Sequence, residues 1–324
     1  MRIARWLLAF TALMGVLGNA LAADGDDWPR RTVKLVLPNA PGSSSDTLAR
    51  ILANYLGMQT GQTVIVENAA GGGGIIGMDM VKNAAPDGYT LVAVTPAGTT
   101  IAANLRKGLT YDPINDFQYV SMYAVLPNLL VVTPSLPVKS LQELIDYAKN
   151  RKEDTFMASA GPGSQSHLAG AMLETMGKFP SIHVPYKGGG ASVRAVMTGE
   201  AQWTITPASS VIGLARSGKL RALAQSLPER TPLLADIPAV NETIPGYNYS
   251  GWNGIAVPKG TPAPIVEKIR AALMKTLAMP EVKEAFGKQG AAIVTNSSEE
   301  FRRIVQQELE TTGTVVKAAN IQMD

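Results

Sequence analysis

The chain has no cysteine among its 324 residues. This absence excludes disulfides, thiolate catalysis, metal sites with Cys ligands and lipid attachment to an N-terminal Cys. Histidine is also scarce, with His167 and His183 alone, and aromatic residues make up 6% of the chain. The net charge is only +3, and the sequence has no basic stripe with interleaved aromatics. A nucleic-acid binder held by electrostatic attraction is therefore not expected.

Long apolar runs are missing after the N-terminus. There, Arg2 and Arg5 precede the mostly apolar stretch Trp6–Gly18, which is shorter than the roughly 18–20 residues that a membrane span needs. The segment 20–22 then supplies the small-x-small pattern of a cleavage site. The sequence predicts that residues 1–22 are a cleaved signal peptide and that the mature protein is soluble in a bacterial periplasm.

Strand patterns alternate with helix patterns along the first part of the chain. Short apolar runs predict strands at Val33–Leu37, Val64–Val66 and Thr90–Val94. Between the first two, apolar residues over 48–57 recur at helical spacing up to a terminating glycine. This order is typical of a parallel sheet with crossover helices.

The same alternation recurs later in the chain. Strands are expected at Phe156–Ala158, Ile182–Val184, Gln202–Thr206, Leu220–Ala224 and Gly254–Val257, and a last strand is expected near Ala291–Thr295. Roughly 300 residues exceed one typical domain, so two lobes are predicted. We assign 23–125 with 250–324 to lobe 1 and 126–249 to lobe 2. The chain then crosses near 124–127 and 248–252, as a hinge requires.

Two polar loops rich in glycine and serine precede predicted helices. The first spans Pro38–Asp46 and the second spans Ser159–His167. Each offers small hydroxyls and free backbone N–H groups at a helix N-terminus, where the partial positive charge favours anions. The three serines Ser43–Ser45 exceed what helix capping needs. Because the loops lie in different halves of the chain, they predict a cleft that holds a carboxylate from both sides.

Two further strand-to-helix loops are expected at Thr95–Thr99 and Tyr186–Gly190, at the ends of strands where ligands bind in parallel sheets. Asp46 would repel an anion, so we assign it to bonding the N–H groups of its own loop. His167 is expected to pack or hydrogen-bond beneath the second loop. The candidate ligand-binding residues are Pro38, Gly42, Ser43, Ser44, Ser45, Thr95, Ala97, Ser159, Gly161, Gly163, Ser164, Tyr186, Gly188, Thr206 and Pro207.

Other kinds of site have weaker support. The segment 72–77 matches G-x-G-x-x-G, but the following strand ends without the acid that a dinucleotide's ribose needs, so close packing of the glycines is favoured. An exported hydrolase using Ser164 and His167 remains an alternative, although no third partner or nucleophile elbow is apparent. We expect a non-enzymatic monomer without cofactor or metal.

Six segments together resemble the periplasmic solute receptors of tripartite tricarboxylate transporters, often called Bug-type receptors. They are LPNAPGSSSDTLAR at 37–50, VIVENAAGGGGIIG at 64–77, AAPDGYTL at 84–91, HVPYKGGG at 183–190, GKLRALA at 218–224 and GIAVPKGTP at 254–262. Their order and spacing extend over nearly the whole chain after the signal.

This resemblance implies an α/β Venus-flytrap fold, the type II-like periplasmic-binding-protein architecture, with a hinge between two parallel or mixed sheets. It also implies capture of a small organic carboxylate, which is a di- or tricarboxylate or an aromatic acid, and its delivery to integral-membrane transporter subunits. A receptor that only signals to a kinase is the alternative. The family's carboxylate loops match 38–46, 159–164 and 186–188. Ser43 stands where the family usually has a second glycine, and Thr206 where it often has Asp.

Overall fold

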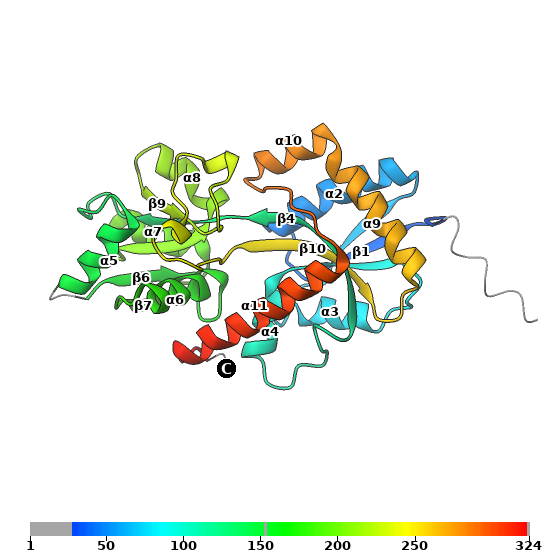
Figure 1. The fold of residues 1–324 in the computed structure, drawn as a ribbon, viewed down its shortest axis with the longest axis horizontal. Coiled ribbons are helices and arrows are strands. Elements are labelled where there is room, and N and C mark those ends of the chain that lie inside the picture. Colours follow the sequence, from blue (N-terminus) through cyan, green and yellow to red (C-terminus); the bar gives the residue numbers. More distant parts are fainter. Residues whose placement is uncertain (1–27, 152–153, 323–324) are drawn as a thin grey trace, which may run out of the picture.

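The computed structural model describes residues 28–151 and 154–322, and Figure 1 shows two α/β lobes side by side. The predicted signal peptide at 1–22 lies outside the described residues. The first sheet has the order β2-β1-β3-β10-β4. Its strands are β1 (Val33–Leu37), β2 (Val64–Asn68), β3 (Thr90–Val94), β4 (Phe117–Leu126) and β10 (Gly251–Pro258).

Helices cover both faces of this first sheet. The helices of this part of the chain are α2 (Ser44–Thr60), α3 (Ile75–Lys82), α4 (Thr100–Leu105), α9 (Ala263–Ala278), α10 (Pro280–Lys288) and α11 (Ser298–Ala318), with a 3-10 turn η1 at Pro96–Gly98. Helices α2, α9 and α10 share one apolar core with the sheet, which includes Leu48, Ile269 and Phe286. Met78 of α3 and Phe301 of α11 belong to the core on the other face.

The second sheet has the order β7-β6-β8-β5-β9. Its strands are β5 (Asn128–Val132), β6 (Phe156–Ser159), β7 (Ile182–Pro185), β8 (Trp203–Pro207) and β9 (Arg221–Gln225). Its helices are α5 (Leu141–Asn150), α6 (Gln165–Gly177), α7 (Gly189–Thr198) and α8 (Ala208–Arg216), and 3-10 turns lie at Pro232–Leu234 and Val240–Glu242. Leu144 and Leu168 pack on one face of the sheet, and Val196 and Val211 pack on the other.

Both sheets are mixed rather than wholly parallel. β1 pairs in parallel with β2 and β3, but β10 runs antiparallel to β3 and β4. β5 is likewise antiparallel to β8 and β9. The prediction of a strand near Ala291–Thr295 is wrong, because this segment makes only an isolated β-bridge from Ala292 to Val125. β4 and β5 were not predicted at all, since both are almost entirely buried and show no regular alternation of polar and apolar residues.

The chain passes between the sheets twice. Pro127 alone separates β4 from β5, and the segment 226–250 connects β9 to β10. Figure 1 shows β4 and β10 running side by side from one lobe toward the other. The sequence expects the crossings near 124–127 and 248–252, and these positions, like the lobe boundaries of 23–125 with 250–324 and 126–249, stay a proposal.

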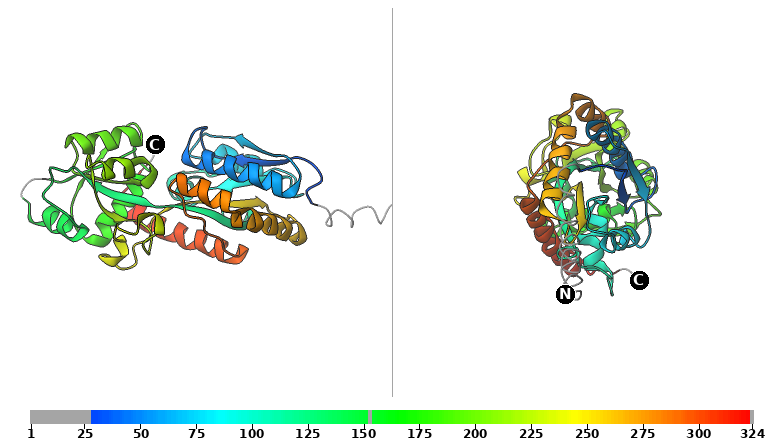
Figure 2. Two further views of the ribbon diagram at one scale, coloured as in Figure 1. Left: turned by 90° about the horizontal axis from the view of Figure 1, so that it is seen from above. Right: turned by 90° about the vertical axis from the view of Figure 1, so that its right-hand side faces the viewer.

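The C-terminal helix α11 makes a third connection. Phe301 near its start lies in a core of the first sheet, whereas Val315 near its end belongs to a core of the second sheet. Ile321, just beyond the helix, joins that same core, as do Ile101 and Leu105 of α4. In both views of Figure 2, α11 lies along the outside of the molecule. No helix in the described residues is both long enough and apolar enough to cross a bilayer.

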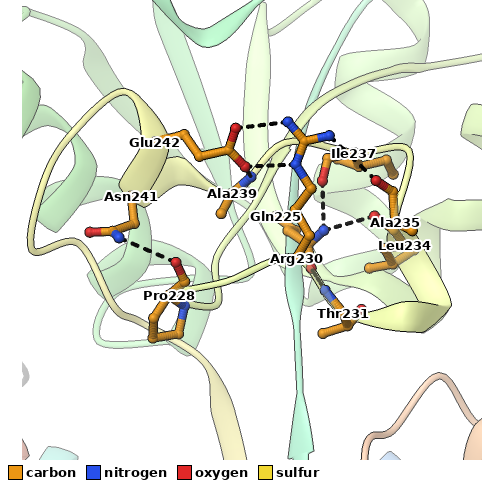
Figure 3. A network of polar contacts seen from close by, with 10 residues as sticks. All are labelled: Gln225, Pro228, Arg230, Thr231, Leu234, Ala235, Ile237, Ala239, Asn241 and Glu242. Carbon is orange, nitrogen blue, oxygen red and sulfur yellow. Dashed lines mark hydrogen bonds and ion pairs between the residues drawn. The ribbon is translucent and has the colours of Figure 1, made fainter.

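The long connection 226–250 is ordered by its own polar contacts (Figure 3). Gln225 Nε2 donates to the carbonyls of Leu234, at 2.8 Å, and Ile237, at 2.6 Å. Arg230 forms a two-pronged ion pair with Glu242, with both N–O distances at 2.7 Å. The bond from Arg230 lowers the pKa of Glu242 to about 2. The segment that returns the chain to the hinge therefore has a defined path.

Candidate ligand-binding cleft

A cavity of about 280 Å³ lies between the two lobes. The first lobe contributes the start of α2, the glycine loop at 72–73 and the segment from η1 to the end of α4. The second lobe contributes the start of α6 and Pro207. The lining residues are Asn39, Ser43, Ser44, Ser45, Gly72, Gly73, Thr95, Pro96, Ala97, Ile101, Ala102, Leu105, Arg106, Leu126, Gly163, Ser164, Gln165, Pro207, Gly251, Trp252 and Asn253.

The first turn of α2 faces this cavity. Ser43 is the N-cap, and its Oγ accepts the N–H of Asp46 at 3.2 Å. Ser44 and Ser45 are the first two helical residues, and all three serines line the cavity. The backbone N–H groups at such a position lack partners within the helix. The start of α2 therefore presents both hydroxyls and amide donors to the cleft.

Asp46 is bound within its own loop. Its carboxylate accepts the N–H of Gly42 and the side-chain amide of Asn68, each at 2.9 Å, and it pairs with Arg50 at 3.0 Å. Burial raises the pKa of Asp46, but the bonds from Gly42, Arg50 and Asn68 outweigh burial and lower the pKa below its usual value. Asp46 thus stays ionised and fixes the backbone of the loop beside the cavity.

The start of α6 mirrors this arrangement from the other lobe. Ser164 is the N-cap and accepts the backbone N–H of His167 at 3.3 Å. Ser166 Oγ accepts the N–H of Ala160 at 2.9 Å, which ties the two ends of the loop together. Gly163, Ser164 and Gln165 line the cavity. Two helix N-termini from different lobes therefore meet at one cleft.

Two stacked histidines, His167 and His183, hydrogen-bond to residues of this second loop. Gly163 N–H donates to His167 Nδ1 at 3.1 Å, and the His167 ring stacks on His183 with centroids 3.7 Å apart. His183 Nε2 lies 2.6 Å from Ser159 Oγ. Burial, helped by His183, lowers the pKa of His167 to about 4. A neutral ring is needed because a protonated Nδ1 does not accept the Gly163 hydrogen bond.

Three polar atoms that line the cleft have no hydrogen-bond partner among the described residues. They are Asn39 Oδ1, Thr95 Oγ1 and Asn253 Oδ1. Buried polar atoms are nearly always satisfied by protein, water or ligand. Thr95 was predicted from the sequence, but Asn39 and Asn253 were not. Asn39 lies inside the first predicted loop, whereas nothing in the strand pattern around Asn253 marks it.

Arg106 is the only charged residue among the described residues that line the cavity. It follows the last residue of α4, a six-residue helix whose pattern was too short to predict. The apolar lining residues are Pro96, Ala97, Ile101, Ala102, Leu105, Leu126 and Trp252. The cleft therefore combines hydrogen-bond donors, one positive charge and apolar side chains, with no lining carboxylate among the described residues.

The predicted site residues divide into two groups. Ser43, Ser44, Ser45, Thr95, Ala97, Gly163, Ser164 and Pro207 line the cavity, while Pro38, Gly42, Ser159, Gly161, Tyr186, Gly188 and Thr206 are not among its lining residues. Tyr186 donates its hydroxyl hydrogen bond to Glu200 at 2.9 Å, and Thr206 lies inside β8 with 2% of its surface exposed. The buried Ser159 side chain is engaged with His183. The ligand contacts of all these residues stay predictions.

The geometry gives little support to the hydrolase alternative. Ser164 Oγ accepts the backbone N–H of His167, and the His167 ring accepts the Gly163 amide with its Nδ1. The acceptor nitrogen that a general base needs is thus already occupied. No group of three potential metal ligands occurs in the part of the chain that the structure describes.

Some glycines of the segment 72–77 allow close packing, and others line the cleft. A Cβ on Gly77 would lie 3.0 Å from both the Ala69 carbonyl and Pro38 Cα, and one on Gly74 would lie 3.1 Å from Gly98 Cα. These contacts bring α3 close to the sheet edge, as expected from the sequence. Gly72 and Gly73 line the cavity.

Comparison with known proteins identifies the family. The family described as "Tripartite tricarboxylate transporter family receptor" matches residues 48–321. The chain belongs to this family of periplasmic solute-binding receptors. Protein BugT of Bordetella pertussis is 32% identical over 319 residues, which cover 98% of each chain.

Two solved structures are similar to this chain over most of its length. An R. palustris protein solved with adipate is 33% identical with a TM-score of 0.76, covering 91% of this chain and 99% of that one. MatC from Rhodopseudomonas palustris, solved with bound malate, is 31% identical with a TM-score of 0.72, covering 89% of this chain and 100% of that one. The two-lobed architecture of this receptor is thus that of periplasmic binding proteins.

Proposed function

We propose that this receptor captures a small dicarboxylate without an amino group in the interlobe cleft and delivers it to a tripartite tricarboxylate-type membrane transporter. The observation that carries the proposal is the meeting of the α2 and α6 N-termini in one cavity that Arg106 also lines. Relatives solved with adipate and malate, both dicarboxylates, support the same ligand class.

A first carboxylate fits between the two helix starts. The N-terminus of a helix carries about half a positive charge and unpaired N–H donors, so two of them favour an anion from both sides. Ser44 and Ser45 add hydroxyl donors from lobe 1, and Ser164 adds one from lobe 2. Hydrogen bonds to a charged group contribute about 1.5–3 kcal/mol each, so three or four suffice for micromolar binding after the costs of ordering.

A second carboxylate fits Arg106. The guanidinium offers a rigid fork of donors that matches carboxylate geometry. The apolar residues that also line the cavity suit a hydrocarbon chain or a flat ring. The volume of about 280 Å³ lies near the lower end of typical ligand pockets, which start at roughly 300 Å³. A short aliphatic or a single-ring dicarboxylate is thus the best match.

An amino acid fits less well. Burial of its ammonium group needs a nearby acceptor, preferably a carboxylate. The described lining residues include no Asp or Glu. Asp46, the acid of the first loop, does not line the cavity, and its carboxylate is bound by Gly42, Asn68 and Arg50. Asn39 and Asn253 could offer amide oxygens, but neither carries charge.

Calorimetry with adipate, succinate, citrate and an aromatic dicarboxylate, compared with aspartate and glutamate, tests this assignment. We expect at least one acid without an amino group to bind more tightly than both amino acids. Tighter binding of an amino acid than of all four acids would contradict it. Recovery of the ligand unchanged after prolonged incubation distinguishes a receptor from the exported hydrolase.

The proposal has three further parts. The protein is exported through the signal at 1–22, acts as a monomer and delivers its ligand to integral-membrane transporter subunits. Family membership supports a periplasmic location and a transport role. Deletion of the gene should abolish uptake of the labelled acid. If uptake persists while a transcriptional response to the acid is lost, the receptor serves a sensor kinase instead.

A further inference from the structure

Trp252 lies between two cavities. It lines the ligand cleft, and it also lines a second, larger cavity of about 940 Å³. We call this second cavity the rear groove; its lining includes Met122, Met172, Tyr249, Ile304, Glu308 and Val315. Trp252 is a residue of the hinge strand β10, and only 4% of its surface is exposed. Trp252 therefore belongs to the walls of both the cleft and the rear groove.

Helix α11 contacts this indole in two ways. The Nε1–H group of Trp252 donates to Glu308 Oε2 at 2.5 Å. The ring of Phe301 packs edge to face against the indole, with ring centroids 5.3 Å apart. Phe301 lies in the first turn of the same helix. The hydrogen bond is directional, so it restrains the rotation of the indole in addition to the packing against Phe301.

The helix that carries Glu308 is itself held in place. Asn104 Nδ2 of α4 donates to the carbonyl of Leu309 at 2.9 Å. Val315, two turns beyond Glu308, packs in the core of the second lobe. The acceptor for the indole therefore sits on a segment that is anchored to both lobes.

Glu308 is suited to this role at neutral pH. Burial raises the pKa of its carboxyl to about 7, although the hydrogen bonds from Trp252 and Thr100 oppose this rise. Both the neutral and the ionised carboxyl group keep an oxygen that accepts the indole N–H. A glutamine at this position also keeps such an oxygen, which makes it a matched replacement.

We propose that Glu308 is a positioning residue for ligand binding, which fixes the Trp252 indole as a wall of the cleft by accepting its N–H. This inference rests on the proposed function only in that the cleft is the ligand site. Without the acceptor, the indole N–H loses its partner and the ring gains freedom. Binding must then order the ring again, which lowers the affinity about three- to tenfold for one side chain.

The test compares three variants by titration with adipate. We expect Glu308→Ala to weaken binding about three- to tenfold, since ordering one side chain costs affinity on that scale. Glu308→Gln should bind within about twofold of the parent because it retains the acceptor. Glu310→Ala is the matched control, since Glu310 lies on the same helix and lines the rear groove without a described bond to Trp252. Parent-like binding by Glu308→Ala, or equal losses for Ala and Gln, would overturn the proposal.

A second measurement separates this inference from the ligand assignment. The indole N–H signal of Trp252, identified by its disappearance in Trp252→Phe, should exchange slowly with solvent in the parent and in Glu308→Gln. It should exchange faster in Glu308→Ala, with no ligand present. Failure of the parent to bind adipate would count against the proposed ligand, while unchanged exchange in Glu308→Ala would overturn the positioning role.

Discussion

The Gly163 N–H group donates to Nδ1 of His167 at 3.1 Å, so the loop that begins α6 depends on a neutral imidazole. His167 is stacked on His183, and its pKa is lowered to about 4 by burial and by that neighbour. In the unfolded chain the pKa is about 6.5. The folded protein therefore resists protonation of His167 over the interval between these values.

The stability contribution of this histidine should be present above about pH 6.5 and should be lost as the pH falls toward about 4, on the order of 1–3 kcal/mol after solvent screening. His167→Gln removes the titrating group. Urea unfolding of both proteins at several pH values should show a shallower decline for the variant in this window. An identical slope would mean that His167 titrates alike in the folded and unfolded states.

Arg106→Gln should reduce affinity for a dicarboxylate about ten- to a hundredfold, because it removes a charge-assisted contact. The same change should affect a monocarboxylate of equal length only weakly. Arg303→Gln serves as the control, since Arg303 is exposed on α11 and does not line the cleft. Equal losses for both acids would place the second carboxylate elsewhere.

Ser44→Ala and Ser164→Ala should each weaken binding about five- to 150-fold, because each removes one hydroxyl donor from the anion. The two variants should differ in stability. Ser164 is an N-cap, so its replacement costs about 1 kcal/mol of unfolding free energy, whereas Ser44 lies one residue inside α2 and has no capping bond to lose. Calorimetry and thermal melting check the two effects separately. If both variants bind like the parent, the carboxylate binds elsewhere or is held by backbone amides alone.

Both lobes line the cleft, so a ligand that touches both binds the closed arrangement better and shifts the population toward it. Small-angle scattering should show a smaller radius of gyration at saturating ligand than without ligand. An unchanged radius would indicate that the lobes do not move relative to each other. The packing of α11 against both lobes would then be the structural feature that holds them.

Local patterns predicted most of the fold. The strand at Val33–Leu37 was placed to the residue, because a buried parallel strand flanked by turn residues has a clear signature. β4 and β5 were missed because Phe117 to Val132 is almost continuously buried, so no alternation of polar and apolar residues marks the two strands that Pro127 separates. The antiparallel entry of β10 into the first sheet is a long-range pairing that no local pattern encodes.

The candidate site was predictable where it consists of helix starts. Ser43 and Ser164 stand in polar loops that mark an N-terminus, and both line the cavity. Arg106 and Trp252 carry no such signal, since one follows a six-residue helix and the other lies in a buried strand. Tyr186 was expected from the loop pattern, but its hydroxyl donates to Glu200, which follows the C-cap of α7.

The most direct measurement is a crystal structure of the receptor with adipate bound. One carboxylate should lie within hydrogen-bond distance of Ser44 or Ser45 and of Ser164, and the other should lie against Arg106. A carboxylate bound outside this cleft, or bound within it with no contact to either helix start, would contradict the account.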